Sequence, residues 1–257
     1  IGLKDLLDHQ EGDVRDFDQL KSVFGDFKPE VVFHLAAQSI PAISFDNPWD
    51  TLETNIRSQL NILHSARVLG LRARILVIGS NEEYGHPKKG DLPFAEESPL
   101  RPANPYAVSK VAQDMLGLQY HLSHGLDTIR VRPFNHIGPR QNLGFVVPDF
   151  CSQIAAIEAG HLPPVLRVGN LDARRDFTDV RDVVGQLATL AEAPAAVGEV
   201  FNVGNDREEV SILELAERVK ARTGSKSEIV LVPYEKAYEE GFEDMQRRVP
   251  DLSKLRA

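Results

Sequence analysis

The chain has 257 residues, of which 42% are hydrophobic, and this is long enough to bury a core. Its 29 basic and 38 acidic residues give a net charge of −9, which argues against general binding of nucleic acid. No stretch approaches the roughly 20 apolar residues that span a bilayer, and the lone Cys151 excludes an internal disulfide. We therefore expect a cytoplasmic protein with neither nucleic acid nor membrane as a partner, and we find no spacing typical of a metal site.

Three short apolar runs predict buried strands, and each run is followed by polar or small residues. The runs cover residues 30–35, 73–79 and 127–132. Between the first two, Asn47-Pro48 opens a predicted helix. The apolar residues expected on one face of this helix are Leu52, Ile56, Leu60 and Leu63. Alternating strands and helices predict an α/β fold with a doubly wound parallel sheet, whose ligands bind beyond the carboxyl ends of the strands.

Tyr106 and Lys110 are four residues apart, a spacing that places both side chains on one face of a helix. A free tyrosine has a pKa of about 10, which makes it a poor acid or base at neutral pH. An ammonium about 4 Å away would favour the phenolate by roughly 4 kcal/mol before the cost of desolvation. We therefore expect Lys110 to lower the pKa of Tyr106 toward the range of efficient general acid/base catalysis.

Four segments, in this order and spacing, resemble the extended short-chain dehydrogenases/reductases that act on nucleotide-sugars, the NAD-dependent epimerase/dehydratase family. The segments are His34 to Ala37, Ser80 to Gly85, Asn104 to Lys110 and Arg175 to Val180. Residues 134–139 and 168–172 look most similar to GDP-4-keto-6-deoxy-mannose reductases. The resemblance implies a Rossmann-like doubly wound sheet with a smaller C-terminal substrate-binding lobe.

A glycine-rich turn that binds the cofactor pyrophosphate is expected in such a fold, and no such pattern occurs in this sequence. By comparison with the family, we expect a chain truncated at both ends. Residues 1–140 would form the dinucleotide-binding part without its first βαβ unit, and 141–257 mostly the substrate-binding lobe. A segment around 179–203 would return to the dinucleotide-binding part. The residue that selects NAD or NADP normally ends the second strand, so the choice between them stays open.

The resemblance also assigns roles to individual residues. It implies a catalytic set of Ser80, Tyr106, Lys110 and Glu82. It implies contacts with NAD or NADP from Asp13, Val14, Leu35, Ala36, Ala37, Asn55, Ile78, Tyr106, Lys110, Pro133 and His136. It implies substrate contacts, or support of the substrate loops, from Asn135, Arg140, Phe145, Val146, Arg175, Asn202 and Arg248. Arginine suits a diphosphate because its planar fork donates paired hydrogen bonds. We expect His34 and Cys151 to fill core space instead.

The leading hypothesis is reduction of the C4 ketone of GDP-4-keto-6-deoxy-mannose to a GDP-6-deoxyhexose. Glu82 keeps a nucleotide-sugar 4,6-dehydratase as the alternative, because a glutamate at this place removes the C5 proton in such enzymes. A 4-epimerase comes third, and a nucleotide-sensing scaffold that kept the fold is the non-enzyme alternative. The resemblance also implies a homodimer through a four-helix interface, to which Val111, Met115 and Leu118 would contribute.

Overall fold

The computed structural model describes residues 7–232 and 245–257. Its central sheet has four parallel strands in the order β1-β2-β3-β8. The strands are β1 (Val31–His34), β2 (Arg74–Ile78), β3 (Thr128–Pro133) and β8 (Val200–Val203). The three predicted strands are thus confirmed, and β8 adds a fourth neighbour to β3. A parallel sheet needs crossover connections, and helices supply them here.

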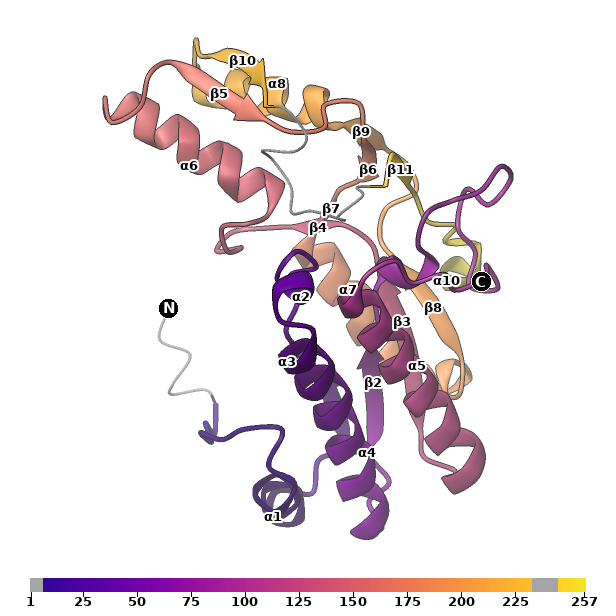
Figure 1. Cartoon of the computed structure of the whole chain (residues 1–257). Helices are drawn as coiled ribbons and strands as arrows, with labels where there is room; N and C mark the ends of the chain where they lie inside the picture. Colours follow the sequence, from indigo (N-terminus) through magenta and orange to yellow (C-terminus); the bar gives the residue numbers. More distant parts are fainter. Residues whose placement is uncertain (1–6, 233–244) are drawn as a thin grey trace.

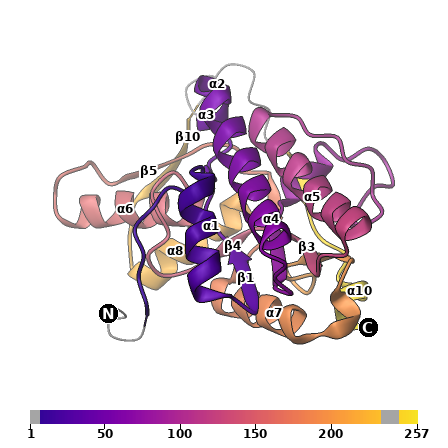
Figure 2. The ribbon, with the colours of Figure 1, turned by 90° about the horizontal axis from the view of Figure 1, so that it is seen from below.

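Helices cover both faces of this sheet, as Figure 2 shows from below. On one face lie α1 (Phe17–Phe27), α4 (Ser58–Val68) and α5 (Pro105–His124), and on the other lies α7 (Val180–Glu192). Successive residues of β2 alternate between the two cores: Ile75 and Val77 pack beneath α4, whereas Leu76 packs against α7. The predicted Rossmann-like, doubly wound fold is therefore confirmed.

The helix predicted after Asn47-Pro48 forms, but it is interrupted. It consists of α3 (Pro48–Leu52), one π-helical turn (Glu53–Arg57) and α4, preceded by the short α2 (Ile43–Asp46). The expected apolar face was wrong in part, because Leu60 is 39% exposed while Asn55 and Gln59 are fully buried. A π turn shifts the residues that follow it around the helix axis, which regular helical spacing does not anticipate.

A smaller lobe lies beyond the end of β3, at the top of Figure 1. It contains α6 (Val146–Glu158), α8 (Ile212–Thr223) and the parallel pair β5 (Val165–Val168) and β10 (Glu228–Leu231). A three-stranded sheet of β6 (Arg174–Asp176), β9 (Glu209–Ser211) and β11 (Arg247–Arg248) adjoins it. The lobe has its own core around Phe150, Ile154 and Leu166. Cys151 is exposed on α6, so the expectation that it fills core space was wrong.

Short elements connect the two parts. The strand β4 (His136–Ile137) pairs with β7 (Thr178–Asp179), so the segment after β3 is bonded to the segment that leads into α7. The chain ends in α10 (Ser253–Arg256), close to β8. The division of the chain at residue 140 stays a prediction. Among the described residues no helix is both long enough and apolar enough to cross a bilayer.

Candidate active site

A cavity of about 640 Å³ opens at the carboxyl ends of β1, β2 and β3, where ligands of doubly wound sheets bind. It brings together all four predicted catalytic residues. Predicted cofactor contacts on its wall are Leu35, Ala37, Ile78, Pro133 and His136. Predicted substrate contacts on its wall are Asn135, Arg140, Phe145, Val146 and Arg248. The remaining predicted residues do not line this cavity.

The start of α5 sets the positions of Tyr106 and Lys110. Asn104 caps this helix, since its side chain accepts a hydrogen bond of 2.7 Å from the Ala107 amide, and Pro105 occupies the first turn. Tyr106 and Lys110 are both buried, and the Lys110 ammonium donates a hydrogen bond of 2.9 Å to the carbonyl of Ile78. The Nζ atom of Lys110 lies 5.8 Å from the centroid of the Tyr106 ring. The end of β2 and the first turns of α5 therefore form one wall.

The expected lowering of the Tyr106 pKa by Lys110 was wrong for this structure. Burial raises the pKa of the phenol well above its usual value, and a hydrogen bond with Ser80 offsets only part of that rise. Burial also lowers the pKa of Lys110 to about 8, against a smaller opposing effect of Glu83. Removal of both groups from water thus outweighs the attraction that their spacing suggested. These effects keep the Tyr106 phenol in its neutral form.

Glu82 is held by neighbours on both of its carboxylate oxygens. Oε1 lies 2.7 Å from Nη2 of Arg248, and Oε2 accepts a hydrogen bond of 3.1 Å from the Asn104 side chain. Arg248 also donates a bond of 3.2 Å to Oδ1 of Asn81. The pair is almost fully buried, with 10% and 12% of the two side chains exposed. Both oxygens of the Glu82 carboxylate are thus engaged by donors of the protein.

The residues from Ser80 to Tyr84 form a 3-10 turn (Asn81–Tyr84) capped by Ser80. The Ser80 hydroxyl accepts a bond from the Glu82 amide, and the Ser80 amide donates one of 2.8 Å to Oε1 of Glu83. Asn81, Glu83 and Asn104 were not among the predicted site residues. The signals were present, because Ser-x-x-Glu is a capping-box pattern and Asn-Pro is a helix start.

Several predicted site residues lie outside the cavity wall. Asn55 and Asn202 are fully buried and bond to other parts of the protein. Asn55 bonds to both backbone groups of Gln38 and to the Ser109 hydroxyl, so it ties the loop after β1 to α5. Asn202 receives a hydrogen bond of 2.7 Å from Tyr84 and donates one to the Phe94 carbonyl. These contacts fit support of the surrounding loops.

The other residues outside the wall are Asp13, Val14, Ala36 and Arg175. Asp13 pairs with Arg15 at 2.8 Å, and this contact lowers the pKa of Asp13 to about 2. The carbonyl of Val14 accepts a bond of 3.0 Å from Asn61 on α4. Arg175 is buried on β6, directly beside Arg248 on β11, and donates to the carbonyl of Arg174. The cofactor and substrate roles of all four stay predictions.

The described residues fit the nicotinamide half of a dinucleotide. Ile78, Pro133 and Ala37 give the cavity an apolar wall suited to a flat ring, beside the hydroxyl of Tyr106 and the ammonium of Lys110. His34 lies at the same end of β1 and is buried, with Nδ1 at 2.8 Å from Oε1 of Gln59. Its Nε2 has no hydrogen-bond partner among the described residues. Apolar lining with a few convergent polar groups is typical of cofactor sites.

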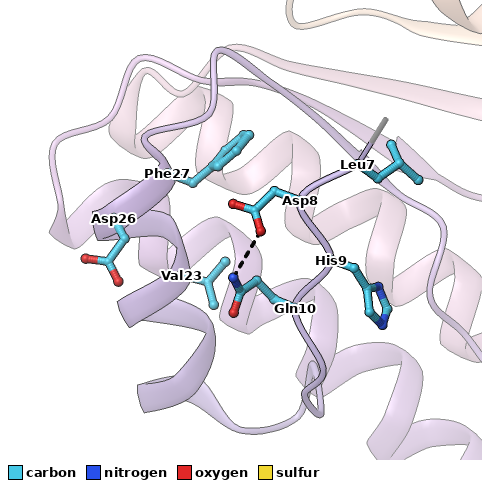
Figure 3. A pocket seen from close by; sticks show the side chains of 7 residues that line it. All are labelled: Leu7, Asp8, His9, Gln10, Val23, Asp26 and Phe27. Carbon is cyan, nitrogen blue, oxygen red and sulfur yellow. Dashed lines mark hydrogen bonds between the residues drawn. The ribbon is translucent and has the colours of Figure 1, made fainter. Parts of the chain in front are cut away.

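A second pocket lies beside α1 and contains none of the catalytic residues (Figure 3). Its wall includes Leu7 and Phe27, which are 61% and 68% exposed, and a hydrogen bond of 3.3 Å joins Gln10 to Asp8. No three His, Cys, Asp or Glu side chains among residues 7–232 and 245–257 lie close enough to hold a metal ion. The cavity at the end of the central sheet is therefore the candidate active site.

The sequence matches the family model of GDP-mannose 4,6 dehydratase over residues 3–257. The chain belongs to this family. The match confirms the predicted extended short-chain dehydrogenase/reductase family and, with it, an enzyme. The chain is also 38% identical to GDP-6-deoxy-D-mannose reductase of Pseudomonas aeruginosa over 205 residues, which are 80% of this chain and 67% of that protein. It is 33% identical to GDP-mannose 4,6-dehydratase of Vibrio cholerae over 67% of this chain and 46% of that one.

Solved structures show the same arrangement. RMD from Pseudomonas aeruginosa in complex with NADPH superposes with a TM-score of 0.86 at 33% identity, covering 96% of this chain and 80% of the other. UDP-glucose 4-epimerase of Thermus thermophilus in complex with NAD gives a TM-score of 0.82 at 28% identity, covering 95% and 76%. These two complexes agree with the predicted cofactor, NAD or NADP. The family's members thus share the fold while their named reactions differ.

Proposed function

We propose that this protein reduces the C4 ketone of a GDP-4-keto-6-deoxy-hexose with NADH or NADPH. The observation that carries the proposal is the meeting of Ser80, Tyr106 and Lys110 at one wall of the cavity. The similarity to GDP-6-deoxy-D-mannose reductase supports this choice of substrate. Two arginines on the cavity wall, Arg140 and Arg248, fit a substrate that carries a diphosphate.

The residues divide the chemistry of a carbonyl reduction among them. A reduced nicotinamide, when bound, supplies the hydride. The Ser80 hydroxyl orients the ketone oxygen, and the neutral Tyr106 phenol gives that oxygen its proton as the carbon becomes tetrahedral. Lys110, held at the Ile78 carbonyl, would hold the ribose of the cofactor and stabilise the phenolate left behind. Because Tyr106 begins the reaction protonated, its high pKa suits reduction.

A 4,6-dehydratase remains the second candidate because Glu82 lies on the cavity wall beside Ser80 and Tyr106. Such an enzyme needs a free carboxylate to remove the C5 proton. Both oxygens of Glu82 are engaged, one by Arg248 and the other by Asn104. The contacts of Glu82 therefore favour the reductase, in which this residue has no proton to remove.

Two substrates separate the candidates. A reductase oxidises one NADPH or NADH per molecule of GDP-4-keto-6-deoxy-mannose and leaves GDP-mannose unchanged. A dehydratase converts GDP-mannose to the 4-keto product without net consumption of cofactor. Glu82→Gln should slow the reduction less than about tenfold, since the amide keeps one acceptor for Arg248, whereas loss of a dehydratase's base costs roughly 10² or more. Failure of the full chain to bind any nicotinamide cofactor would instead support a non-catalytic scaffold.

We also propose a cytoplasmic homodimer formed through α4 and α5. Three apolar residues on α5, each seven apart, are exposed on one side of this helix: Val108, Met115 and Leu122. Leu60 on α4 is exposed as well. Met115 belonged to the predicted interface, while its predicted partners Val111 and Leu118 are half-buried. Repetition at seven-residue spacing is typical of helices that pack against other helices.

A further inference from the structure

Glu83 is a buried acid to which the proposed chemistry gives no task. It follows Glu82 on the 3-10 turn, but it is fully buried and does not line the cavity. Its Oε1 accepts the hydrogen bond from the Ser80 amide at 2.8 Å. A methyl group on Gly79 would lie 2.2 Å from the same oxygen, so the glycine is needed for this close approach. One end of the carboxyl group is thus fixed to the backbone of the catalytic serine.

The other oxygen of Glu83 faces a buried cluster of charges. Oε2 lies 3.3 Å from Nε of Arg132 on β3, but it has no hydrogen-bond partner among the described residues. Arg132 directs its Nε to Asp114 on α5 instead, at 2.8 Å. Asp114 also pairs with Arg130 at 2.9 Å, so both of its oxygens are engaged by arginines. Asp114 is four residues after Lys110 and therefore shares its helix face.

We propose that Glu83 is a positioning residue that fixes the backbone of Ser80 relative to α5, and that it does so as a neutral carboxylic acid. One oxygen accepts from the Ser80 amide, and the protonated oxygen donates toward Asp114. The turn that carries Ser80 and the helix that carries Tyr106 and Lys110 are then joined behind the cavity. This inference rests on the proposed function only in that the reduction of the keto-sugar nucleotide is used to measure kcat.

The groups around Glu83 favour its neutral form. Asp114 and Lys110 face it from α5, Arg132 faces it from β3, and Tyr84 adjoins it on its own turn. Burial and then the Asp114 carboxylate raise the pKa of Glu83, Arg132 opposes both, and the pKa lies at about 8 as a result. An unpaired carboxylate in this place would cost more free energy than a single guanidinium returns, because that guanidinium already serves Asp114.

Two variants test the positioning with the keto-sugar nucleotide as substrate. Glu83→Gln keeps the acceptor for Ser80 and offers N–H donors toward Asp114, so kcat should stay within about threefold of the wild type. Glu83→Ala removes both bonds, and kcat should fall at least about tenfold, with KM for either substrate changed less than twofold. Glu96→Ala is the control, since Glu96 is a buried acid of the neighbouring network that bonds to the Asn202 amide instead. It should lower stability and leave kcat of the folded protein within twofold.

Two further measurements need no substrate, so they separate this inference from the proposed function. Amide hydrogen exchange of residues 79–85 should accelerate at least tenfold in Glu83→Ala and stay near the wild-type rate in Glu83→Gln. The thermal midpoint of the wild type should fall between about pH 6.5 and 8 more than that of Glu83→Gln, because the folded state holds a proton that the unfolded state has lost. Equal pH slopes, or a Gln variant as impaired as the Ala variant, would overturn the inference. If the wild type did not reduce the keto-sugar nucleotide but both of these results were obtained, only the proposed reaction would be refuted.

Discussion

Tyr106 is the residue on which the proposed chemistry depends, and its environment keeps it protonated. The phenol is buried, hydrogen-bonded to Ser80 and adjacent to the buried Lys110. Desolvation penalises the phenolate, so this tyrosine begins as an acid rather than a base. A group in that state can complete a ketone reduction by one proton transfer.

We expect Tyr106→Phe to lower kcat for reduction by roughly 10²-fold or more, because it removes the proton donor and little else. Steady-state oxidation of NADPH measures the effect. Tyr84→Phe is a matched control, since Tyr84 is equally buried and its hydroxyl bonds to Asn202 away from the cavity. That control should lower the unfolding free energy by about 1 kcal/mol and leave turnover near normal. Near-normal turnover of Tyr106→Phe would refute its role.

The buried His34 makes the stability of the folded protein depend on pH. Burial lowers the pKa of this imidazole to about 4, against the opposing effect of the hydrogen bond that its Nδ1–H donates to Oε1 of Gln59. Because the unfolded state takes up a proton near the ordinary pKa, this contribution is complete above about pH 6.5 and is lost as pH falls toward 4. Its size is up to roughly 3 kcal/mol.

His34→Gln should therefore flatten the loss of stability between pH 6.5 and 4 relative to the wild type. Urea unfolding at several pH values measures the difference. Burial raises the pKa of Asp176 to about 6, so the contribution of Asp176 to stability increases as pH falls over part of this range. This contribution is the same in the wild type and in His34→Gln, so it does not affect the comparison. Parallel curves for the two proteins would show that His34 is not buried as the neutral form.

At the scale of elements, the turn after β2 depends on a glycine. Gly85 has a φ of +64°, and a methyl group added there would lie 1.8 Å from the carbonyl oxygen of Arg101. No side-chain rotation relieves such a contact, because the added methyl group is fixed to the backbone and the Arg101 oxygen belongs to the backbone. The turn therefore admits only glycine at this position.

We expect Gly85→Ala to destabilise the protein by more than about 2 kcal/mol and to reduce kcat, since Ser80 and Glu82 belong to the same turn. Gly90→Ala provides the comparison, because Gly90 also has a positive φ of 93° but has open space around it. That variant should cost only about 1 kcal/mol, the strain of the backbone alone. Equal losses in thermal unfolding would show that the contact with Arg101 is unimportant.

Regular elements followed from the sequence where short-range signals were strong. Apolar runs ending in glycine or in polar or small residues marked β1, β2 and β3, and Asn47-Pro48 marked the start of α3. The π turn after Leu52 has no comparable signal, so the buried face of the next helix was misplaced. The exposure of Cys151 was missed because the sequence does not show which side of α6 the described part of the lobe covers.

The part of the site that could be predicted from the sequence is the part that belongs to recognisable motifs. Ser80, Tyr106 and Lys110 meet because parallel strands end at one edge and α5 begins there. The ionisation of the tyrosine was not predictable from spacing, because the sign depends on how far burial outweighs the nearby charge. The partners of Glu82 and Glu83 come from β11, β3 and α5, so they required tertiary structure.

At the scale of the whole molecule, the exposed residues of α5 bear on assembly. We expect Met115→Glu to shift the protein from dimer to monomer in sedimentation velocity, because a charge at the centre of a helix–helix contact is costly to bury. Leu162→Glu changes an equally exposed apolar residue outside α4 and α5 and should leave the dimer intact. A dimer that persists in Met115→Glu would place the contact elsewhere.

The π turn from Glu53 to Arg57 has a consequence for how much length variation this region tolerates. A wide turn accommodates one residue more than a regular helix of the same rise, so shortening it by one residue should produce an unbroken helix. Residues downstream to Val68 would then keep their places on the sheet, because the residue removed is the one that the π turn absorbs. The packing of Leu63 should survive such a deletion, whereas contacts made inside the turn, such as the hydrogen bond from Asn55 to Ser109, should change. A one-residue deletion is therefore tolerated better in this turn than in the regular helix that follows it.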